Sequence, residues 1–237
     1  MRLREDPWLA GVLERPVFRV DGASPPDPGS LREHAAAHSG GLYWARVPTE
    51  DVAAARDLAA AGFYPVDTTV TFRRHTDAPP EPPVATIIRC CDTHAEEVVE
   101  IGGMAFGASR FHLDPAIPDE LANRVKRNWA RNNATGERGV ACSVALRHGR
   151  PEGFLSVLAT NGDAQRRVID LVAVRPESQG RGVGRALVEA FIRHHGTECD
   201  ELEVGTQAAN VASLSMYGSL GFRVWRTSYV MHLHAAA

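Results

Sequence analysis

The 237-residue sequence has no apolar run approaching the roughly 20 residues that cross a bilayer. It has four cysteines and no CxxC pair, which favours free thiols in a reducing compartment. No strong charge of either sign is present, since the net charge is −3, and no basic field favours nucleic acid. Residues 1–20 carry scattered charges and no apolar core of a secretion signal. We therefore expect a cytoplasmic protein that binds neither membrane nor nucleic acid.

The hydrophobic content of 44% is enough for a buried core, and the length fits one large domain or two small ones. The segment 75–84, HTDAPPEPPV, contains four prolines and is typical of a stiff, extended linker. It predicts a boundary between a shorter N-terminal region, residues 1–74, and a longer C-terminal region, residues 85–237.

The longer region alternates between strand-like and helix-like patterns, which predicts an α/β domain with a mixed sheet. Expected helices cover residues 92–106, 118–132, about 182–195 and 210–221. Expected strands cover residues 85–90, 139–149, 152–163, 166–174, 200–206 and 222–234.

A faint internal repeat relates residues 42–74 to the last strand–helix–strand unit, with Gly62 aligned on Gly221. In this alignment Leu58 stands where the later copy has Tyr217. Either the N-terminal region is a degenerate copy without the polar groups, or two alanine-rich helices resemble each other by chance. On the first interpretation we expect no chemistry in the N-terminal copy.

Three glycines, Gly180, Gly182 and Gly184, stand where an apolar strand meets a helical pattern. A helix N-terminus offers unpaired N–H donors and partial positive charge, and glycine lets a ligand approach the backbone. The spacing fits neither GxxxxGK[ST] nor GxGxxG. The turn is therefore an anion site of another kind, or a plain strand-to-helix connection.

The run VRPESQGRGVG resembles the acetyl-coenzyme A (acetyl-CoA) signature Q/R-x-x-G-x-G/A of the GCN5-related N-acetyltransferase (GNAT) superfamily. The resemblance extends over residues 85 to 235 in element order. It implies the acyl-CoA N-acyltransferase fold, with a smaller degenerate GNAT-like N-terminal half, and direct acetyl transfer from acetyl-CoA to a primary amine without a metal. The implied cofactor contacts are Gln179, Gly180, Arg181, Gly182, Val183 and Gly184 in the turn, and Leu171, Val172, Ala173 and Val174 on the preceding strand.

The resemblance also assigns roles to two residues of the later helix, in the segment NVASLSMYGSLGF. Asn210 is a suitable N-cap and is expected to contact the cofactor, and Tyr217 fills the place of the general acid. Their separation of two helical turns puts both on one face. The alternative is that Tyr217 is only a core aromatic.

A narrower resemblance, carried by AFGASRFHLDP (105–115) and the last helix, is to the N-acetyltransferases of TDP-fucosamine. It implies that the acceptor is a nucleotide-activated amino sugar, with Arg110 on a phosphate, Phe111 on a ring and His112 nearby. Asp170 is a candidate base, although a salt-bridged strand residue is the alternative. No other residue suggests a general base.

Other acceptors stay open: another small amine, an antibiotic or a protein N-terminus, or no catalysis at all in a protein that only binds acetyl-CoA. His232 and His234 alternate on the last strand, but no third metal ligand is apparent in the sequence. That strand is also a possible edge through which a homodimer would pair.

Overall fold

The computed structural model describes residues 2–21, 28–76, 86–89, 92–160 and 163–236. Of the predicted linker, residues 77–84 lie outside this range, as do Cys90 and Cys91. The helices are α1 (Pro7–Leu13), α2 (Pro28–Ala37), α3 (Val52–Ala60), α4 (Ala95–Met104), α5 (Asp119–Ala134), α6 (Val183–His195) and α7 (Val211–Ser219). Short 3-10 turns cover Asp92–His94 and Pro176–Ser178.

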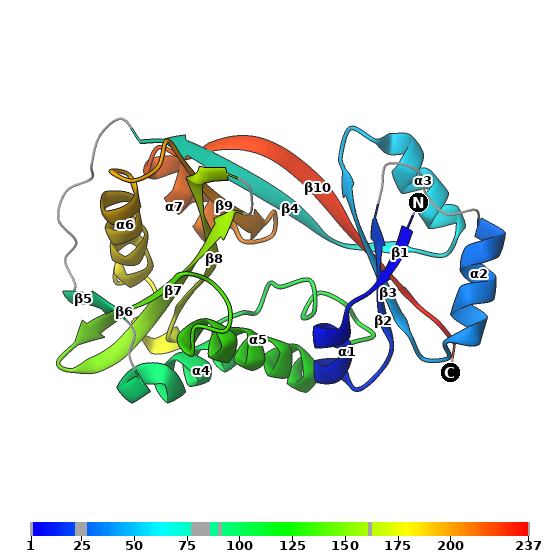
Figure 1. Cartoon of the computed structure of the whole chain (residues 1–237), viewed down its shortest axis with the longest axis horizontal. Coiled ribbons are helices and arrows are strands. Elements are labelled where there is room, and N and C mark those ends of the chain that lie inside the picture. Colours follow the sequence, from blue (N-terminus) through cyan, green and yellow to red (C-terminus); the bar gives the residue numbers. More distant parts are fainter. Residues whose placement is uncertain (1, 22–27, 77–85, 90–91, 161–162, 237) are drawn as a thin grey trace.

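The strands are β1 (Arg2–Glu5), β2 (Val17–Asp21), β3 (Leu42–Pro48), β4 (Tyr64–His75), β5 (Thr86–Arg89), β6 (Ala141–Arg147), β7 (Arg150–Thr160), β8 (Asp163–Val174), β9 (Glu201–Gln207) and β10 (Arg223–His234). All of them join one mixed sheet in the order β1-β2-β3-β10-β4-β9-β8-β7-β6-β5. The α/β expectation is confirmed, and Figure 1 shows the long strands β4 and β10 connecting the two ends of the molecule.

The position of β10 differs from the expectation of a dimerising edge. This strand pairs with β3 on one side and with β4 on the other, so its backbone groups are already used within the chain. The described sheet instead ends at β1 and β5. Since an edge needs unpaired N–H and C=O groups, β10 is not available for pairing with a second copy.

The two strand–helix–strand units have matching local geometry. Asp51 caps α3 by accepting from the Ala54 N–H at 3.0 Å, and Asn210 caps α7 by accepting from the Ser213 N–H at 3.2 Å. Each helix is followed by a glycine at positive φ, +101° at Gly62 and +80° at Gly221. The sequence alignment of Gly62 on Gly221 therefore coincides with equivalent turns in the structure.

The parallel pairs also match. Residues 17–20 of β2 lie opposite residues 42–45 of β3, and residues 166–169 of β8 lie opposite residues 201–204 of β9. Antiparallel strands flank both pairs, β1 beside β2 and β7 beside β8. The N-terminal half thus repeats the sheet order of the C-terminal half.

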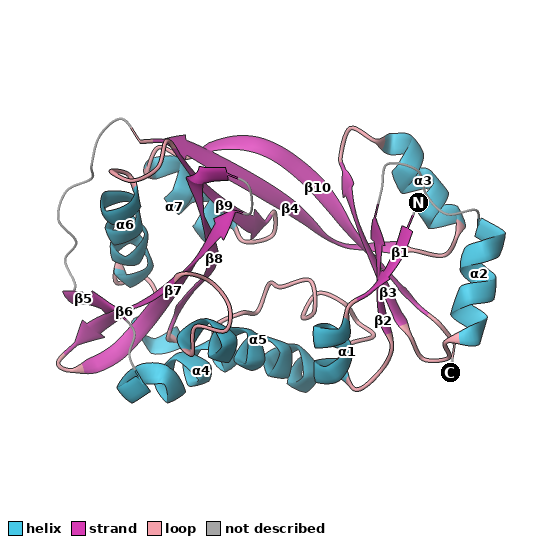
Figure 2. Ribbon diagram, in the orientation of Figure 1, coloured by secondary structure: helices cyan, strands magenta, loops and turns pink. Residues whose placement is uncertain are grey.

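Each half has its own core. In the C-terminal half, α6 and α7 pack Leu187 and Tyr217 against one face of the sheet, and α4 packs Ile101 against the opposite face. In the N-terminal half, α3 packs Leu58 with Tyr43 and Phe18. A further cluster joins α1 to α5 and ties the halves together. Figure 2 shows α4 and α5 on the side of the sheet away from α6 and α7.

Candidate active site

A cleft opens where the parallel strands β8 and β9 part. Their pairing ends at Ile169 opposite Val204, yet β8 runs on to Val174 and β9 to Gln207. The cleft has a volume of about 870 Å³ and is lined by both strands, the glycine turn and α7. A volume of this size is in the range of small-molecule and cofactor sites.

The backbone of β8 directs two amides toward this opening. The Arg175 N–H donates to the backbone oxygen of Glu152 on β7. Because the N–H groups of successive strand residues point to opposite sides, the N–H groups of Val174 and Val172 point away from β7. On that side β9 has already diverged, since its last pair with β8 involves Ile169. A register shift at Asp170 bends β8 at this point.

The glycine turn presents a row of unused donors. Among the described residues, none accepts a hydrogen bond from the backbone N–H groups of residues 180–185. Gly180 and Gly182 have φ values of +73° and +83°, which only glycine adopts without strain, and Gly182 is the N-cap of α6. Gln179 donates from Nε2 to the Val174 oxygen at 3.2 Å and so joins the turn to β8. The geometry is that of an anion site.

Gly184 differs from the other two glycines, since its φ is ordinary and a Cβ there makes only normal contacts with Val174 and Met216. Arg181 and Arg185 are nearby; Arg185 donates to the Ser219 hydroxyl at 2.8 Å. The turn, α6 and α7 are therefore connected through side chains as well as through the cleft.

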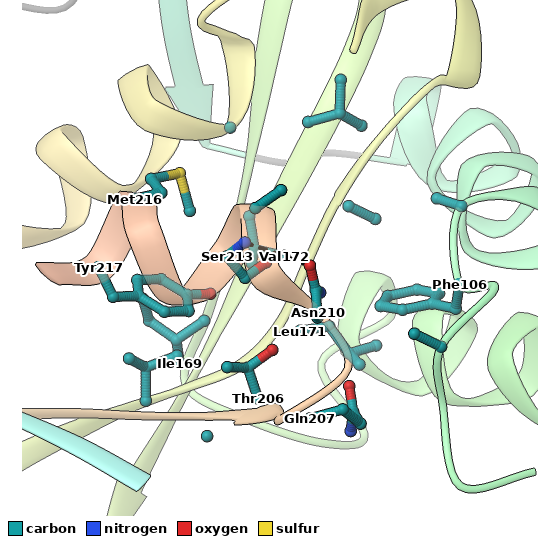
Figure 3. Close-up of a pocket in the computed structure, with 18 of the residues that line it drawn as sticks. Phe106, Ile169, Leu171, Val172, Thr206, Gln207, Asn210, Ser213, Met216 and Tyr217 are labelled. Atoms are coloured by element: carbon teal, nitrogen blue, oxygen red, sulfur yellow. Dashed lines mark hydrogen bonds between the residues drawn. The ribbon is translucent and has the colours of Figure 1, made fainter. Parts of the chain in front are cut away.

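Tyr217 projects from α7 into the cleft (Figure 3). Its ring packs on Phe72 and Phe222, with centroids 5.9 and 5.8 Å away, and the side chain is 1% exposed. Its hydroxyl forms no recorded hydrogen bond with any described residue, and burial raises the pKa of the phenol above its usual value. Tyr217 therefore keeps its proton at neutral pH and has it available for a ligand.

Asn210 lines the same cleft at the start of α7 (Figure 3). Its side-chain oxygen is used by the N-cap, which leaves the amide nitrogen for a ligand. Leu171 and Val172 lie opposite, on β8, so the strand, the turn and the helix predicted to hold the cofactor do line one cleft.

Asp170 is held at the side of the cleft by four hydrogen bonds. It accepts from Trp129 at 2.8 Å, from Asn133 at 2.9 Å, and from Nε and Nη2 of Arg138 at 2.7 and 2.8 Å. Because four donors already occupy the two carboxylate oxygens, this arrangement favours the salt-bridged alternative over a general base.

The three predicted acceptor residues have different environments. Arg110 lies over the rings of Trp44 and Phe111, at 4.0 and 4.6 Å from their centroids. Phe111 is 1% exposed and belongs to the core with Leu9, so its ring supports Arg110 instead of offering a free face. His112 is bound through both ring nitrogens, to Ser109 at 2.6 Å and to Asn123 at 3.0 Å. Of the three, Arg110 is the one with an unused donor.

A buried polar cluster supplies the third group that the two C-terminal histidines lacked in the sequence. Asp114 accepts from His232 at 2.6 Å, from His234 at 2.9 Å and from the Tyr64 hydroxyl at 2.7 Å. Burial raises the pKa of Asp114, but these hydrogen bonds outweigh it and hold the pKa below its ordinary value. Burial lowers the pKa of His232 to about 4. Hydrogen bonds from His232, His234 and Tyr64 to the carboxylate account for the cluster without a metal.

Two cations near the cleft were not found from the sequence. Lys126 is 6% exposed and lines the cleft, and Arg46 lines it from β3. Burial, and secondly the charge of Arg110, lower the pKa of Lys126 to about 8. The available signal was spacing, since Lys126 lies four residues from the buried Ala122 and Ala130 on α5.

Two parting parallel strands, a helix N-terminus with unused amides and a buried phenol define an acyl-CoA N-acyltransferase. Comparison with known proteins agrees. The model of the acetyltransferase (GNAT) family matches residues 108–222. The chain belongs to the GNAT superfamily and by class is an acetyl-CoA-dependent N-acetyltransferase.

Several relatives cover most of the chain. The spore coat polysaccharide biosynthesis protein SpsD of Bacillus subtilis is 26% identical over 95% of this chain and 80% of its own length. Mycothiol acetyltransferase of Tsukamurella paurometabola is 27% identical over 78% of this chain and 65% of its own length. A solved tandem GNAT protein from the clavulanic acid biosynthesis pathway has a TM-score of 0.61 and 16% identity, over 94% of this chain and 76% of that one.

No helix in the described residues combines the length and apolar character needed to span a bilayer.

Proposed function

We propose that this chain transfers the acetyl group of acetyl-CoA to the primary amine of a nucleotide-linked amino sugar. The observation that carries the proposal is the parting of β8 and β9 beside Tyr217, because it brings backbone donors and a phenol to one cleft. The amides of residues 180–185 are suited to the diphosphate of the cofactor.

Two backbone amides of β8 are suited to the thioester carbonyl. The N–H groups of Val172 and Val174 face the opening, where they would donate to the oxygen as negative charge develops on it. A preorganised donor of this kind contributes about 3 kcal/mol to such a step. Acetyl-CoA supplies the activated acyl group, and the amine nitrogen forms a new bond to the acyl carbon as the carbon–sulfur bond breaks.

Tyr217 is proposed to protonate the leaving thiolate. The phenol is protonated at neutral pH and would donate its proton to the sulfur as the carbon–sulfur bond breaks. The proton of the attacking amine passes to water, since Asp170 is saturated with donors. Asn210 is proposed to orient the cofactor through its amide nitrogen.

The sugar acceptor is supported by two observations. A relative over nearly the whole chain is named for polysaccharide biosynthesis. In addition, Arg46 and Lys126 line the same cleft and form no ion pair with a carboxylate among the described residues, which favours an anionic acceptor over a simple cationic amine.

A thiol-release assay with mass detection of the product tests the function. The panel contains dTDP- and UDP-linked amino sugars beside simple amines, and acetylation of a nucleotide-linked sugar is the expected result. Efficient acetylation of simple amines alone would contradict the sugar assignment.

The role of Tyr217 is tested separately with Tyr217→Phe. We expect kcat to fall by about 10²–10⁴-fold with little change in acetyl-CoA affinity, the range of acid catalysis. Tyr229→Phe, at a partly buried tyrosine packed in the N-terminal core, is the matched control. Near-normal turnover of Tyr217→Phe would remove the acid role.

A further inference from the structure

A second cavity, of about 460 Å³, lies between the N-terminal half and α5 and adjoins the cleft. Arg46, Trp129 and Arg138 line both spaces. The second cavity and the cleft are therefore neighbours, with these three side chains between them. Four arginines line this cavity, together with the acids Asp6 and Glu137: Arg19, Arg46, Arg110 and Arg138.

Two of the four arginines are already neutralised. Arg19 pairs with Asp21 at 2.6 Å, and Arg138 pairs with Asp170 at 2.7 Å. Within the described residues, no carboxylate forms an ion pair with Arg46 or Arg110. The Asp6 carboxylate is used in capping α1, where it accepts from the Leu9 N–H at 3.1 Å.

Arg110 and its neighbour Trp44 have buried donors without partners. Arg110 Nη1 and Trp44 Nε1 are each inaccessible to solvent and form no hydrogen bond in the described structure. A buried donor without an acceptor costs free energy, and more so when it carries charge. Trp44 also holds Arg110 in place, because the guanidinium lies 4.0 Å from its ring centroid.

Positive charges predominate around Arg46 and Arg110. The pKa of Arg110 is lowered by burial and then by the charge of Arg46. The pKa of Arg46 is lowered by burial and then by the charges of Arg226 and Arg19. The buried Asp67 opposes the effect on Arg46 only in part. Cations that repel one another across a cavity become favourable when an anion lies between them.

The internal repeat gives this cavity a counterpart. When the parallel pair β2–β3 is superposed in register on the parallel pair β8–β9, Arg46 of β3 corresponds to Gly205 of β9. In the same register Arg19 of β2 corresponds to Val168 of β8. Gly205 and Val168 line the acetyl-CoA cleft. The cavity therefore occupies, in the N-terminal half, the place that the cleft occupies in the C-terminal half.

We propose that Arg46 and Arg110, the latter positioned by Trp44, bind a diphosphate group of the acceptor in this cavity. The N-terminal half is then a substrate-binding half. This gives a binding role to the N-terminal copy, in which the sequence led us to expect no chemistry. The inference rests on the proposed function for the identity of the acceptor, but the anion site itself does not depend on catalysis.

Guanidinium groups fit the ligand chemistry. Each presents parallel N–H donors to phosphate oxygens, and charge-assisted bonds of this kind are stronger than neutral ones. A diphosphate offers enough acceptors for both guanidinium groups and for Trp44 Nε1. Both a sugar nucleotide and inorganic pyrophosphate contain this diphosphate group, so either could occupy the site.

Calorimetry on the full chain tests the site, with coenzyme A present in excess so that the glycine turn is already filled. The probes are inorganic pyrophosphate, dTDP and UDP. We expect all three to bind, the nucleotides more tightly. Arg46→Ala and Arg110→Ala should each weaken binding by about tenfold or more. Arg56→Ala, at an exposed arginine of α3 paired with Asp57, should leave it unchanged.

Two further measurements keep the proposal falsifiable. Arg46 is an exposed side chain, so we expect Arg46→Ala to fold normally. If Arg110→Ala does not fold, Arg110→Lys replaces it. Acetyl-CoA affinity should be the same in all of them. Absence of diphosphate binding to the wild-type chain, or unchanged binding in Arg46→Ala, would overturn the site.

The outcomes separate the two proposals. Diphosphate binding that depends on Arg46, without acetylation of any sugar nucleotide, would refute the proposed function and leave the site standing. Acetylation of a sugar nucleotide with an unchanged KM in Arg46→Ala would refute the site and leave the function standing.

Discussion

Thr69 of β4 lies directly opposite Ser228 of β10, and the pairing around them is symmetric. On one side of this pair Val70 lies opposite Thr227, and on the other side Thr68 lies opposite Tyr229. Gly62 and Gly221 are 159 positions apart, as are Thr69 and Ser228. The pair thus marks a local two-fold axis between the two halves. It explains why an acetyl-CoA cleft and a cationic cavity lie on either side of one sheet centre.

The glycine turn gives the first prediction. Gly182→Ala should lower the free energy of unfolding by about 1–2 kcal/mol, because its φ of +83° is unfavourable for a residue with a Cβ. The substitution should also raise the KM for acetyl-CoA, because strain in the turn would displace the backbone amides of residues 180–185 that are proposed to bind the cofactor diphosphate. Urea unfolding and steady-state kinetics measure the two effects.

Gly184→Ala is the control, because its Cβ meets Val174 and Met216 only at ordinary contact distance. Its stability should stay the same or rise slightly. Equal effects of the two substitutions would mean that the positive φ of Gly182 does not disfavour a residue with a Cβ, since a Cβ at residue 182 meets no atom within 4 Å.

The Asp170–Arg138 pair gives the second prediction. Asp170→Asn should destabilise the chain by about 2–3 kcal/mol, because a buried carboxylate that serves three side chains is lost. Arg138→Gln should cost less, and the double variant should cost less than the sum, since the two residues are coupled.

The pH–rate profile distinguishes this structural role from catalysis. In a structural role, the profile of the remaining Asp170→Asn activity keeps the wild-type shape. Loss of the acidic limb in this variant, with stability intact, would restore Asp170 as the general base.

The cluster around Asp114 predicts a loss of stability in mild acid. Burial lowers the pKa of His232 to about 4, while an unfolded histidine titrates near 6.5. Between these values the unfolded chain binds the extra proton, so the free energy of unfolding falls as pH falls from about 6.5 to about 4. The contribution is on the order of 3 kcal/mol, and Asp114 adds a further loss below about pH 4.

Urea titrations at several pH values measure this slope. His232→Asn should flatten the slope between pH 6.5 and 4, leaving the part due to His34 and His195, whose pKa values burial also lowers. A wild-type slope in His232→Asn would show that His232 is protonated in the folded chain.

Lys126 gives the fourth prediction. Lys126→Met should raise the free energy of unfolding at pH 7 by about 1–3 kcal/mol, because a buried cation that forms no ion pair with any described carboxylate is replaced by an apolar chain of similar length. The wild-type chain itself should gain stability between about pH 8 and 10.5, where only the unfolded state keeps the proton.

The advantage of the methionine variant should therefore shrink over this pH range. Thermal unfolding at pH 7, 8, 9 and 10 measures it. A variant less stable than wild type at pH 7 would mean that contacts of the Lys126 ammonium with Phe106 and Trp129 outweigh the cost of its burial.

Much of the cofactor side of the site was predictable because its signals are local. The spacing of Asn210 and Tyr217 is a helical periodicity, and both do line one cleft. The caps of α3 and α7 follow from Asp51 and Asn210. The elements before residue 42 were not predicted, because short, weakly patterned segments such as β1 and α2 depend on packing against the rest of the sheet.

The sequence alone determined the class of reaction, since the glycine turn and the helix of Tyr217 each lie within a short stretch whose geometry is set by backbone preferences. Only the tertiary structure decided how the halves combine. It inserts β10 between β3 and β4, brings Asp114 to His232 across 118 residues, and aligns Arg46 with Arg110 on one cavity. Such contacts depend on strand register and on packing between distant segments, and neither is encoded in the spacing of neighbouring residues.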